Sequence, residues 1–232
     1  MNDGTMWALL PLKEFASAKQ RLTGLLGPEQ RIGLLDAMAN DVLQALSGHP
    51  ELDGMLVVSN DPLARELALR YGADFISESE LDAQGLNPVV QAGVARLAQR
   101  GIAEALIIHG DLPLVTPAEI SQLIQHHRHT AQPALTLATD RHGTGSNGLM
   151  CPTGSALTFG YGAASCRWHQ HQAQTLGMAC NVLSLPGMSC DIDAPDDLLA
   201  FLNHPNAAAA IRTRAYLSAS GIARQLLVQE DP

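Results

Sequence analysis

The chain has 232 residues, of which 46% are hydrophobic and 16% are charged. This composition excludes a disordered chain, and the length suits one or two globular domains, with a single α/β domain as the ordinary case. The formal net charge of -9 argues against a general nucleic-acid or anionic-membrane surface. Only Lys13 and Lys19 are lysines among the 14 lysines and arginines, and they lie close together in the sequence.

The apolar runs of the chain have the length of strands, far below the roughly 20 residues that a membrane-spanning helix needs. The first residues lack the basic and apolar segments of a secretory signal. The four cysteines are irregularly spaced and form no CxxC or zinc-binding pattern. We therefore expect a cytoplasmic protein with reduced cysteines, and with neither a membrane nor a nucleic acid as partner.

The first half of the chain alternates between strand and helix patterns. Pro28 suits the first turn of a long helix, because its missing N–H group costs nothing there, and the apolar residues that follow recur at helical spacing. In chain order, the first half predicts a strand over 6–12, a helix over 28–46, a strand over 54–59, a helix over 62–71, a short strand over 73–76 and a helix over 87–100.

The second half continues the alternation. Thr116, Pro117 and Glu119 form a capping box with proline at the first helical position, which marks a helix start. His127 and its histidine neighbours are expected at the solvated end of this helix. The second half predicts a strand over 105–109, a helix from 117, a strand over 134–139, a helix over 166–176, a strand over 182–185 and a helix from 196.

Strands that alternate with helices of about 10–20 residues imply crossover connections and a mostly parallel sheet. We therefore predict an α/β fold with one domain over residues 1–205. Residues 206–232 are predicted to form a helical tail that packs on this domain or on a partner subunit, as in a homodimer.

Ligands of open parallel sheets bind beyond the carboxyl ends of the strands, so the segments that follow strands are the candidate sites. Lys13, Lys19 and Arg21 follow the first strand, in a loop without the glycine pattern of a dinucleotide site or a P-loop. Lysine is a mobile point charge and arginine a planar fork, and both suit phosphate groups. A solvated basic loop is the alternative interpretation.

Acidic side chains follow two later strands. Asp111 comes directly after the strand over 105–109 and is placed to offer its carboxylate to a hard cation, unless it only caps the following turn. Asp191 and Asp193 are two residues apart in an extended segment, so their carboxylates face the same way and repel. Binding of Mg²⁺ would offset this repulsion, because this ion is held by one or two carboxylates together with substrate phosphates.

Two glycine-bearing loops are candidate anion sites. The polar loop over 141–148 offers backbone N–H groups and the side chains of Thr144, Ser146 and Asn147, although a flexible surface connection would look similar. The segment over 159–165 leads into a helix, whose amino terminus favours a carboxylate or phosphate. No serine-triad, catalytic-cysteine or HExxH pattern is present, so a phosphate-binding, magnesium-dependent site explains these loops better than a hydrolase does.

Several of these segments occur together in the order seen in CofC-type guanylyltransferases, and the chain resembles this family over roughly residues 6–203. The family comprises the 2-phospho-L-lactate or phosphoenolpyruvate guanylyltransferases of coenzyme F-420 biosynthesis. The segments that carry the resemblance are Pro11-Leu12-Lys13, Lys19-Gln20-Arg21-Leu22, Asp41-Val42-Leu43, Gly85-Leu86-Asn87, Gly110-Asp111-Leu112-Pro113, Gly143-Thr144-Gly145-Ser146-Asn147 and Asp191-Ile192-Asp193-Ala194-Pro195-Asp196-Asp197-Leu198.

The resemblance implies a Rossmann-like nucleotidyltransferase fold of three layers, similar to the nucleotide-diphospho-sugar transferases, with a central, mostly parallel mixed sheet. It implies attack of a substrate phosphate on the α-phosphorus of GTP, release of pyrophosphate, and Mg²⁺ as cofactor. The acceptor would be a small phosphorylated acid: 2-phospho-L-lactate, phosphoenolpyruvate or 3-phosphoglycerate.

The same resemblance assigns roles to residues of this chain. The catalytic candidates are Lys13, Lys19, Arg21 and Asp111. The nucleotide-binding candidates are Pro11, Lys13, Lys19, Gly85, Leu86, Asn87 and Gly110. The acceptor-binding candidates are Thr144, Gly145, Asn147, Gly160, Gly162 and Ser165. The metal-binding candidates are Asp111, Asp191 and Asp193.

Two departures from the family pattern concern the acceptor loops. The segment over 159–165 carries inserted residues, and Ser146 stands where threonine is usual, which keeps the hydroxyl group.

The alternative functions are those of another small-molecule nucleotidyltransferase, such as a cytidylyltransferase or a molybdopterin guanylyltransferase, or of a non-catalytic nucleotide-binding module. Enzymes of the first kind usually carry a glycine-rich loop after the first strand, where this chain has its two lysines.

Overall fold

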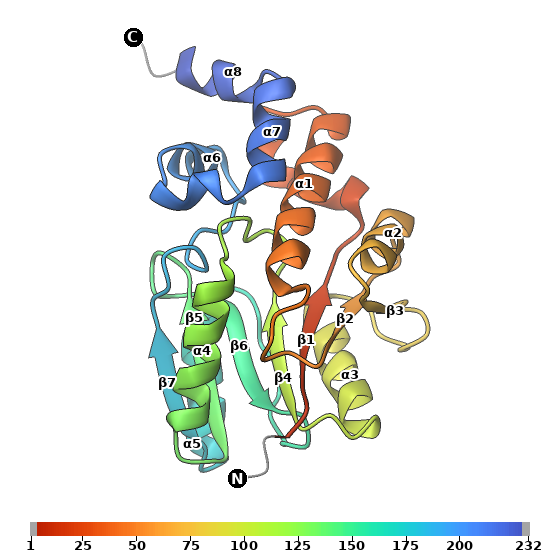
Figure 1. Ribbon diagram of the computed structural model, residues 1–232, viewed down its shortest axis with the longest axis vertical. Coiled ribbons are helices and arrows are strands. Elements are labelled where there is room, and N and C mark those ends of the chain that lie inside the picture. The colour runs from red at the N-terminus through yellow and green to blue at the C-terminus, as the bar shows by residue number, and fades with distance from the viewer. Residues whose placement is uncertain (1–3, 229–232) are drawn as a thin grey trace.

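The computed structural model describes residues 4–228 and confirms the α/β architecture (Figure 1). Within this range the strands form one seven-stranded sheet in the order β3-β2-β1-β4-β6-β5-β7. The strands are β1 (Met6–Pro11), β2 (Gly54–Val58), β3 (Asp74–Ile76), β4 (Glu104–Ile108), β5 (Ala134–Thr139), β6 (Ser146–Pro152) and β7 (Ala179–Leu183). All paired neighbours run parallel except the pairs that β6 makes with β4 and β5.

Strand β6 corrects the prediction of one polar loop over 141–148. The loop ends at Gly145, and Ser146, Asn147 and Gly148 are the first residues of the strand. Its sequence holds no β-branched or aromatic residue, and Asn, Gly and Pro are all depleted in strands. The segment is extended because β4 and β5 pair with it on both sides, which local sequence does not reveal.

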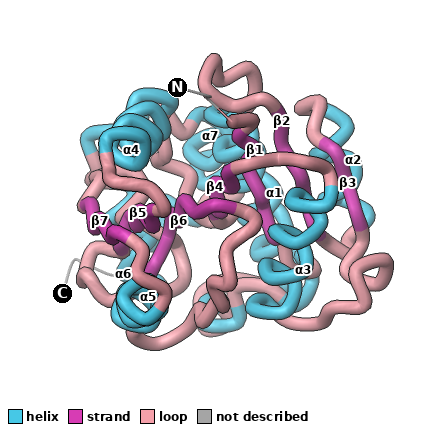
Figure 2. Tube along the Cα trace, turned by 90° about the horizontal axis from the view of Figure 1, so that it is seen from below, coloured by secondary structure: helices cyan, strands magenta, loops and turns pink. Residues whose placement is uncertain are grey.

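Helices cover both faces of the sheet and produce the three layers that were expected (Figure 2). Residues alternate along each strand, so Leu10 of β1 packs in the cluster of α1, α2 and α4, whereas Leu9 packs in the cluster of α3 and α5. The helices are α1 (Pro28–Leu46), α2 (Pro62–Arg70), α3 (Leu86–Gln99), α4 (Pro117–His129), α5 (Ser165–Thr175), α6 (Pro195–Leu202), α7 (Ile211–Ala219) and α8 (Ile222–Val228).

Helix α7 lies beside α1 (Figure 1). The buried carboxylate of Asp41 on α1 accepts hydrogen bonds from the backbone N–H groups of Arg212 and Thr213, at 3.0 and 2.8 Å. These are two of the N–H groups that a helix leaves unpaired in its first turn. Asp41 therefore caps α7 from a different helix. The predicted tail extends to residue 232, and its last four residues lie outside the described range.

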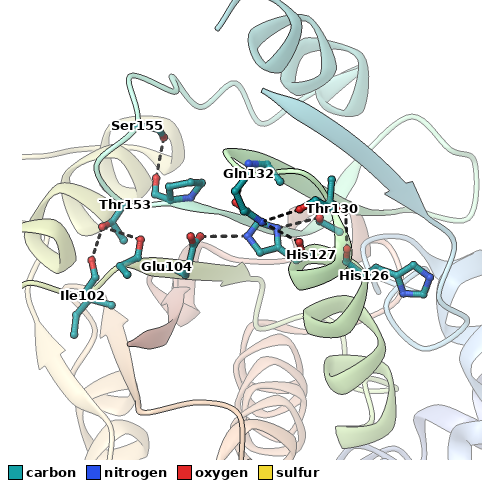
Figure 3. A network of polar contacts seen from close by, with 12 residues as sticks. Ile102, Glu104, His126, His127, Thr130, Gln132, Thr153 and Ser155 are labelled. Carbon is teal, nitrogen blue, oxygen red and sulfur yellow. Dashed lines mark hydrogen bonds and ion pairs between the residues drawn. The ribbon is translucent and has the colours of Figure 1, made fainter. Parts of the chain in front are cut away.

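A second buried polar network lies at the amino-terminal edge of the sheet (Figure 3). His127 on α4 places one ring nitrogen 3.2 Å from Glu104 on β4 and the other 3.0 Å from Thr136 on β5. His127 is buried, with 1% of the residue's surface exposed, so the prediction of a solvated helix end is wrong for His127. The ring joins α4 to two strands because Glu104 and Thr136, distant in sequence, meet there.

Across residues 4–228, none of the helices combines the length and the apolar character that crossing a membrane requires.

Candidate active site

A pocket of about 630 Å³ opens at the carboxyl ends of β1, β4 and β5. The amino end of the reversed strand β6 meets the same edge, so Ser146 and Asn147 also line the pocket. The predicted site residues that line it are Pro11, Lys13, Lys19, Arg21, Leu86, Gly110, Asp111, Thr144, Gly145, Asn147, Gly162, Ser165, Asp191 and Asp193. The structure therefore brings the cationic, acidic and glycine-bearing segments together.

Gly85, Asn87 and Gly160 are not among the lining residues. Asn87 instead holds the backbone of Tyr161: its Oδ1 accepts from the Tyr161 N–H at 2.6 Å, and its Nδ2 donates to the Tyr161 carbonyl at 3.3 Å. A Cβ at Gly160 would lie 2.4 Å from the indole of Trp168, so a larger residue there would force the Trp168 side chain to shift. Gly85 precedes α3 with a φ of 86°, a conformation that favours glycine. Asn87 therefore acts on the pocket through Tyr161, which lines it.

Lys19 joins the cationic loop to the acidic segments. Its Nζ lies 2.6 Å from a carboxylate oxygen of Asp111 and 2.6 Å from one of Asp193, and only 5% of its side chain is exposed. Burial by itself would lower the pKa of Lys19, but the two carboxylates outweigh this effect and raise it. Burial alone would raise the pKa of Asp111, yet the Lys19 ammonium group holds it below its usual value. Lys19 and Asp111 are therefore ionised at neutral pH.

Asp191 faces the same pocket with a different partner. Asn147 donates its side-chain amide to Asp191 at 3.1 Å and to the carbonyl of Met188 at 2.9 Å. Burial, and then the charge of Asp111, raises the pKa of Asp191. Within residues 4–228, no three His, Cys, Asp or Glu side chains are arranged to hold a metal ion by themselves.

Asp140 organises the glycine-bearing loop after β5. Its Oδ1 accepts from the backbone N–H groups of His142 and Thr144, and its Oδ2 accepts from the Thr144 hydroxyl, at distances of 2.8–3.1 Å. Burial would raise the pKa of Asp140, but hydrogen bonds, first with the backbone of Gly145 and then with Thr144 and His142, lower it. The backbone N–H and the hydroxyl of Thr144, which were predicted to bind an anion, therefore donate to Asp140. An aspartate followed by turn residues is a recognisable signal for such a turn, and the sequence reasoning missed it.

Two histidines near the pocket were also missed as functional candidates. His109, directly after β4, lines the pocket and meets the ring of Tyr161 edge to face, with 4.8 Å between ring centroids. Burial lowers the pKa of His109. His169 on α5 is fully buried behind the pocket wall and contacts Ser146. No sequence spacing links either histidine to its partners.

The folds of solved structures agree with this arrangement. A protein of Desulfovibrio desulfuricans G20, assigned to the nucleotide-diphospho-sugar transferases, aligns with a TM-score of 0.73 at 16% identity, over 97% of this chain and 99% of that chain. A nucleotidyl transferase from Methanothermobacter thermautotrophicus aligns with a TM-score of 0.58 at 17% identity, over 86% and 97%. The chain thus has the fold of a class of proteins that includes nucleotidyltransferases.

Sequence comparison narrows the class to a family. The sequence profile of the family described as guanylyl transferase CofC like matches residues 6–226, and the chain belongs to this family of guanylyltransferases. A phosphoenolpyruvate guanylyltransferase of Conexibacter woesei is 36% identical, over 83% of this chain and 85% of that protein. A 3-phospho-D-glycerate guanylyltransferase of Colwellia psychrerythraea is 30% identical, over 85% and 92%. The resemblance seen in the motifs is thereby confirmed.

Proposed function

We propose that this protein transfers GMP from GTP to a small phosphorylated carboxylic acid and releases pyrophosphate, as a step of coenzyme F-420 biosynthesis. Membership of the guanylyl transferase family carries the proposal. Relatives named for phosphoenolpyruvate and for 3-phospho-D-glycerate support acceptors of this kind. Phosphoenolpyruvate is the first candidate, because the relative at 36% identity is named for it.

In this reaction an oxygen of the acceptor's phosphate attacks the α-phosphorus of GTP. The bond from that phosphorus to the oxygen bridging the α- and β-phosphates breaks, and pyrophosphate leaves with the bonding electrons. Several negative charges must meet, so alignment and charge neutralisation supply most of the catalysis. Lys13 and Arg21 line the pocket and are proposed to contact the triphosphate, together with Lys19.

We further propose that Asp111, together with Asp191 or Asp193, holds Mg²⁺ in the reacting complex, where substrate phosphates would complete the set of ligands. The chemistry of the donors fits the ion, because carboxylate oxygens are the ligands that Mg²⁺ prefers. The Lys19 nitrogen contacts both Asp111 and Asp193, so these two carboxylates lie close enough together to share one cation. The glucosyl-3-phosphoglycerate synthase of Mycobacterium tuberculosis, which shares the fold with a TM-score of 0.58 at 15% identity, was solved with Mn²⁺ and a uridine nucleotide. The ion would supply charge neutralisation at the phosphates.

The test is a panel of acceptors. The protein is incubated with GTP, Mg²⁺ and each of phosphoenolpyruvate, 2-phospho-L-lactate and 3-phosphoglycerate, and pyrophosphate release and the mass of the product are measured. CTP, UTP and ATP serve as nucleotide controls. Absence of pyrophosphate with every acceptor would overturn the proposal, and binding of GTP without turnover would indicate a non-catalytic module.

A further inference from the structure

The protonation pattern around His169 follows from its two hydrogen-bond partners. The backbone N–H of Gly160 lies 3.2 Å from Nε2 of His169. A backbone N–H can only donate, so Nε2 accepts and carries no proton. The proton of a neutral imidazole then sits on Nδ1, which donates to the Ser146 hydroxyl oxygen at 2.9 Å. Burial, and then the proximity of His109, lowers the pKa of His169 to about 4, so the ring is neutral at physiological pH.

The two buried serine hydroxyls next to this ring are both left as donors. The Ser146 oxygen accepts from His169, and the Ser165 oxygen accepts from the backbone N–H of Ser146 at 2.9 Å. Neither hydroxyl donates a hydrogen bond to any of the described residues, although both line the pocket and are only 4% and 3% exposed. Two such protons at a helix amino terminus suit an oxyanion.

We propose that His169 is a positioning residue for the guanylyl acceptor. Its Nδ1–H fixes the Ser146 hydroxyl so that this group, beside Ser165, donates to an anionic oxygen of the acceptor. Its Nε2 at the same time holds the loop at Gly160 against the pocket. This inference rests on the proposed function, since it names how that site recognises its acceptor. His169 acts through Ser146 and is not in the pocket itself.

A matched pair of substitutions separates the two ring nitrogens. In His169→Asn the amide N–H takes a place near Nδ1, so the donor to Ser146 is kept. In His169→Gln the amide reaches the place of Nε2, so the contact with Gly160 is kept and the donor to Ser146 is lost. We expect His169→Gln and Ser146→Ala each to raise the acceptor KM about tenfold with the GTP KM unchanged. His169→Asn is expected to recover most of that loss.

The double variant decides whether the two residues act together. If His169 works through Ser146, adding His169→Gln to Ser146→Ala raises the acceptor KM no further. Multiplying effects, or an equal rise in the GTP KM, would overturn the proposal. His171→Gln on the exposed face of α5 is the control and should leave both KM values unchanged. Thermal unfolding of each variant shows whether it is folded.

A readout independent of turnover is the ¹⁵N spectrum of the imidazole in the wild-type protein. The Nδ1–H tautomer of His169 is expected, and the Nε2–H tautomer would overturn the inference. If the wild type transfers GMP to no acceptor, the proposed function fails. If it transfers GMP while the variants show independent effects, only the inference about His169 fails.

Discussion

Lys13 and Lys19 share one loop but differ in their surroundings. Lys13 is exposed at the pocket, whereas Lys19 is buried between two carboxylates. The backbone of Lys19 has a φ of 54°, a left-handed conformation that costs about 1–2 kcal/mol for residues other than glycine. The same residue thus combines an unfavourable backbone conformation with two favourable ion pairs at its ammonium group. Lys19 therefore contributes a charge at a fixed place, and Lys13 a mobile one.

Removal of either lysine should weaken the use of GTP. We expect Lys13→Ala and Lys19→Ala each to lower kcat/KM for GTP by about 100-fold, in the range measured when one donor to a developing oxyanion is removed. Both proteins should remain folded, as thermal unfolding will show. Arg214→Ala, which removes an exposed positive charge on α7, is the control and should leave the rate unchanged. An equal loss in the control would contradict a specific role of the loop.

His169 should make the stability of the protein depend on pH. Its pKa is lowered to about 4 in the folded protein, while the unfolded chain takes up the proton near the ordinary value of 6.5. Between these two pKa values the unfolded state binds more protons than the folded state. The contribution of His169 to the free energy of unfolding is therefore fully present above pH 6.5 and is lost as the pH falls toward 4, by about 3 kcal/mol in all. Urea unfolding at pH 7 and pH 5 measures this, and His169→Gln should flatten the difference. An unchanged difference would assign the effect to other groups.

At the scale of the elements, Asp41 shows how α7 is attached. The helix has alanine at its N-cap position, with no side-chain hydrogen bond there, and takes its cap from α1 instead. Tyr216 adds a hydrogen bond from its hydroxyl to the Gln30 carbonyl, and Gly33 leaves room for its ring. The amino-terminal turn of α7 is thus stabilised by a residue far away in the sequence.

Asp41→Ala should therefore destabilise the protein by about 2 kcal/mol, at the upper end of measured N-cap losses because both oxygens are buried and used. Asp41→Asn keeps one acceptor oxygen and should lose less. Urea unfolding of the two variants measures the loss. The KM for GTP should stay unchanged, because Asp41 does not line the pocket. A larger loss in the asparagine variant would contradict the capping role.

The elements differ in how far local sequence predicts them. Helix α1 has the predicted bounds, because Pro28 marks its start and its apolar residues keep helical spacing. Strand β6 and the burial of His127 depend on partners that are distant in the sequence, so no local pattern shows them. The same holds for the site: the charged and glycine-bearing loops were predicted, but the contact of Ser146 with His169 arises only in the fold.

For the whole molecule, the net charge of -9 and the anionic substrates are compatible because charge acts locally. The screening length in physiological salt is about 8 Å, so distant acidic residues contribute little inside the pocket. The cations that matter are those that line it, Lys13, Lys19 and Arg21. Whole-chain charge therefore excludes polyanionic surfaces without excluding a nucleotide site.

A substitution at the end of the sheet away from the pocket should change the free energy of unfolding without changing substrate binding. His127→Ala leaves Glu104 and Thr136 without their buried partner and should cost about 2 kcal/mol of unfolding free energy. Because this network lies at the edge opposite the pocket, the KM for GTP and for the acceptor should not change. Steady-state kinetics at 25 °C and urea unfolding measure both quantities. A changed acceptor KM would show that the two ends are coupled.

The reversal of β6 has a consequence for how the chain tolerates insertions. The pairing of β6 with β5 already holds one extra residue here, because Thr139 pairs with Ser146 and Ala138 with Gly148, which leaves Asn147 as a bulge. A further residue added within 146–148 would displace Ser146 and Asn147 from the pocket that they line. An added residue at Gly143, in the exposed turn before the strand, would leave the pairing of β6 with β4 and β5 intact. The start of β6 therefore has a fixed length where the chain meets its small ligand, whereas the tip of the turn can accept an insertion.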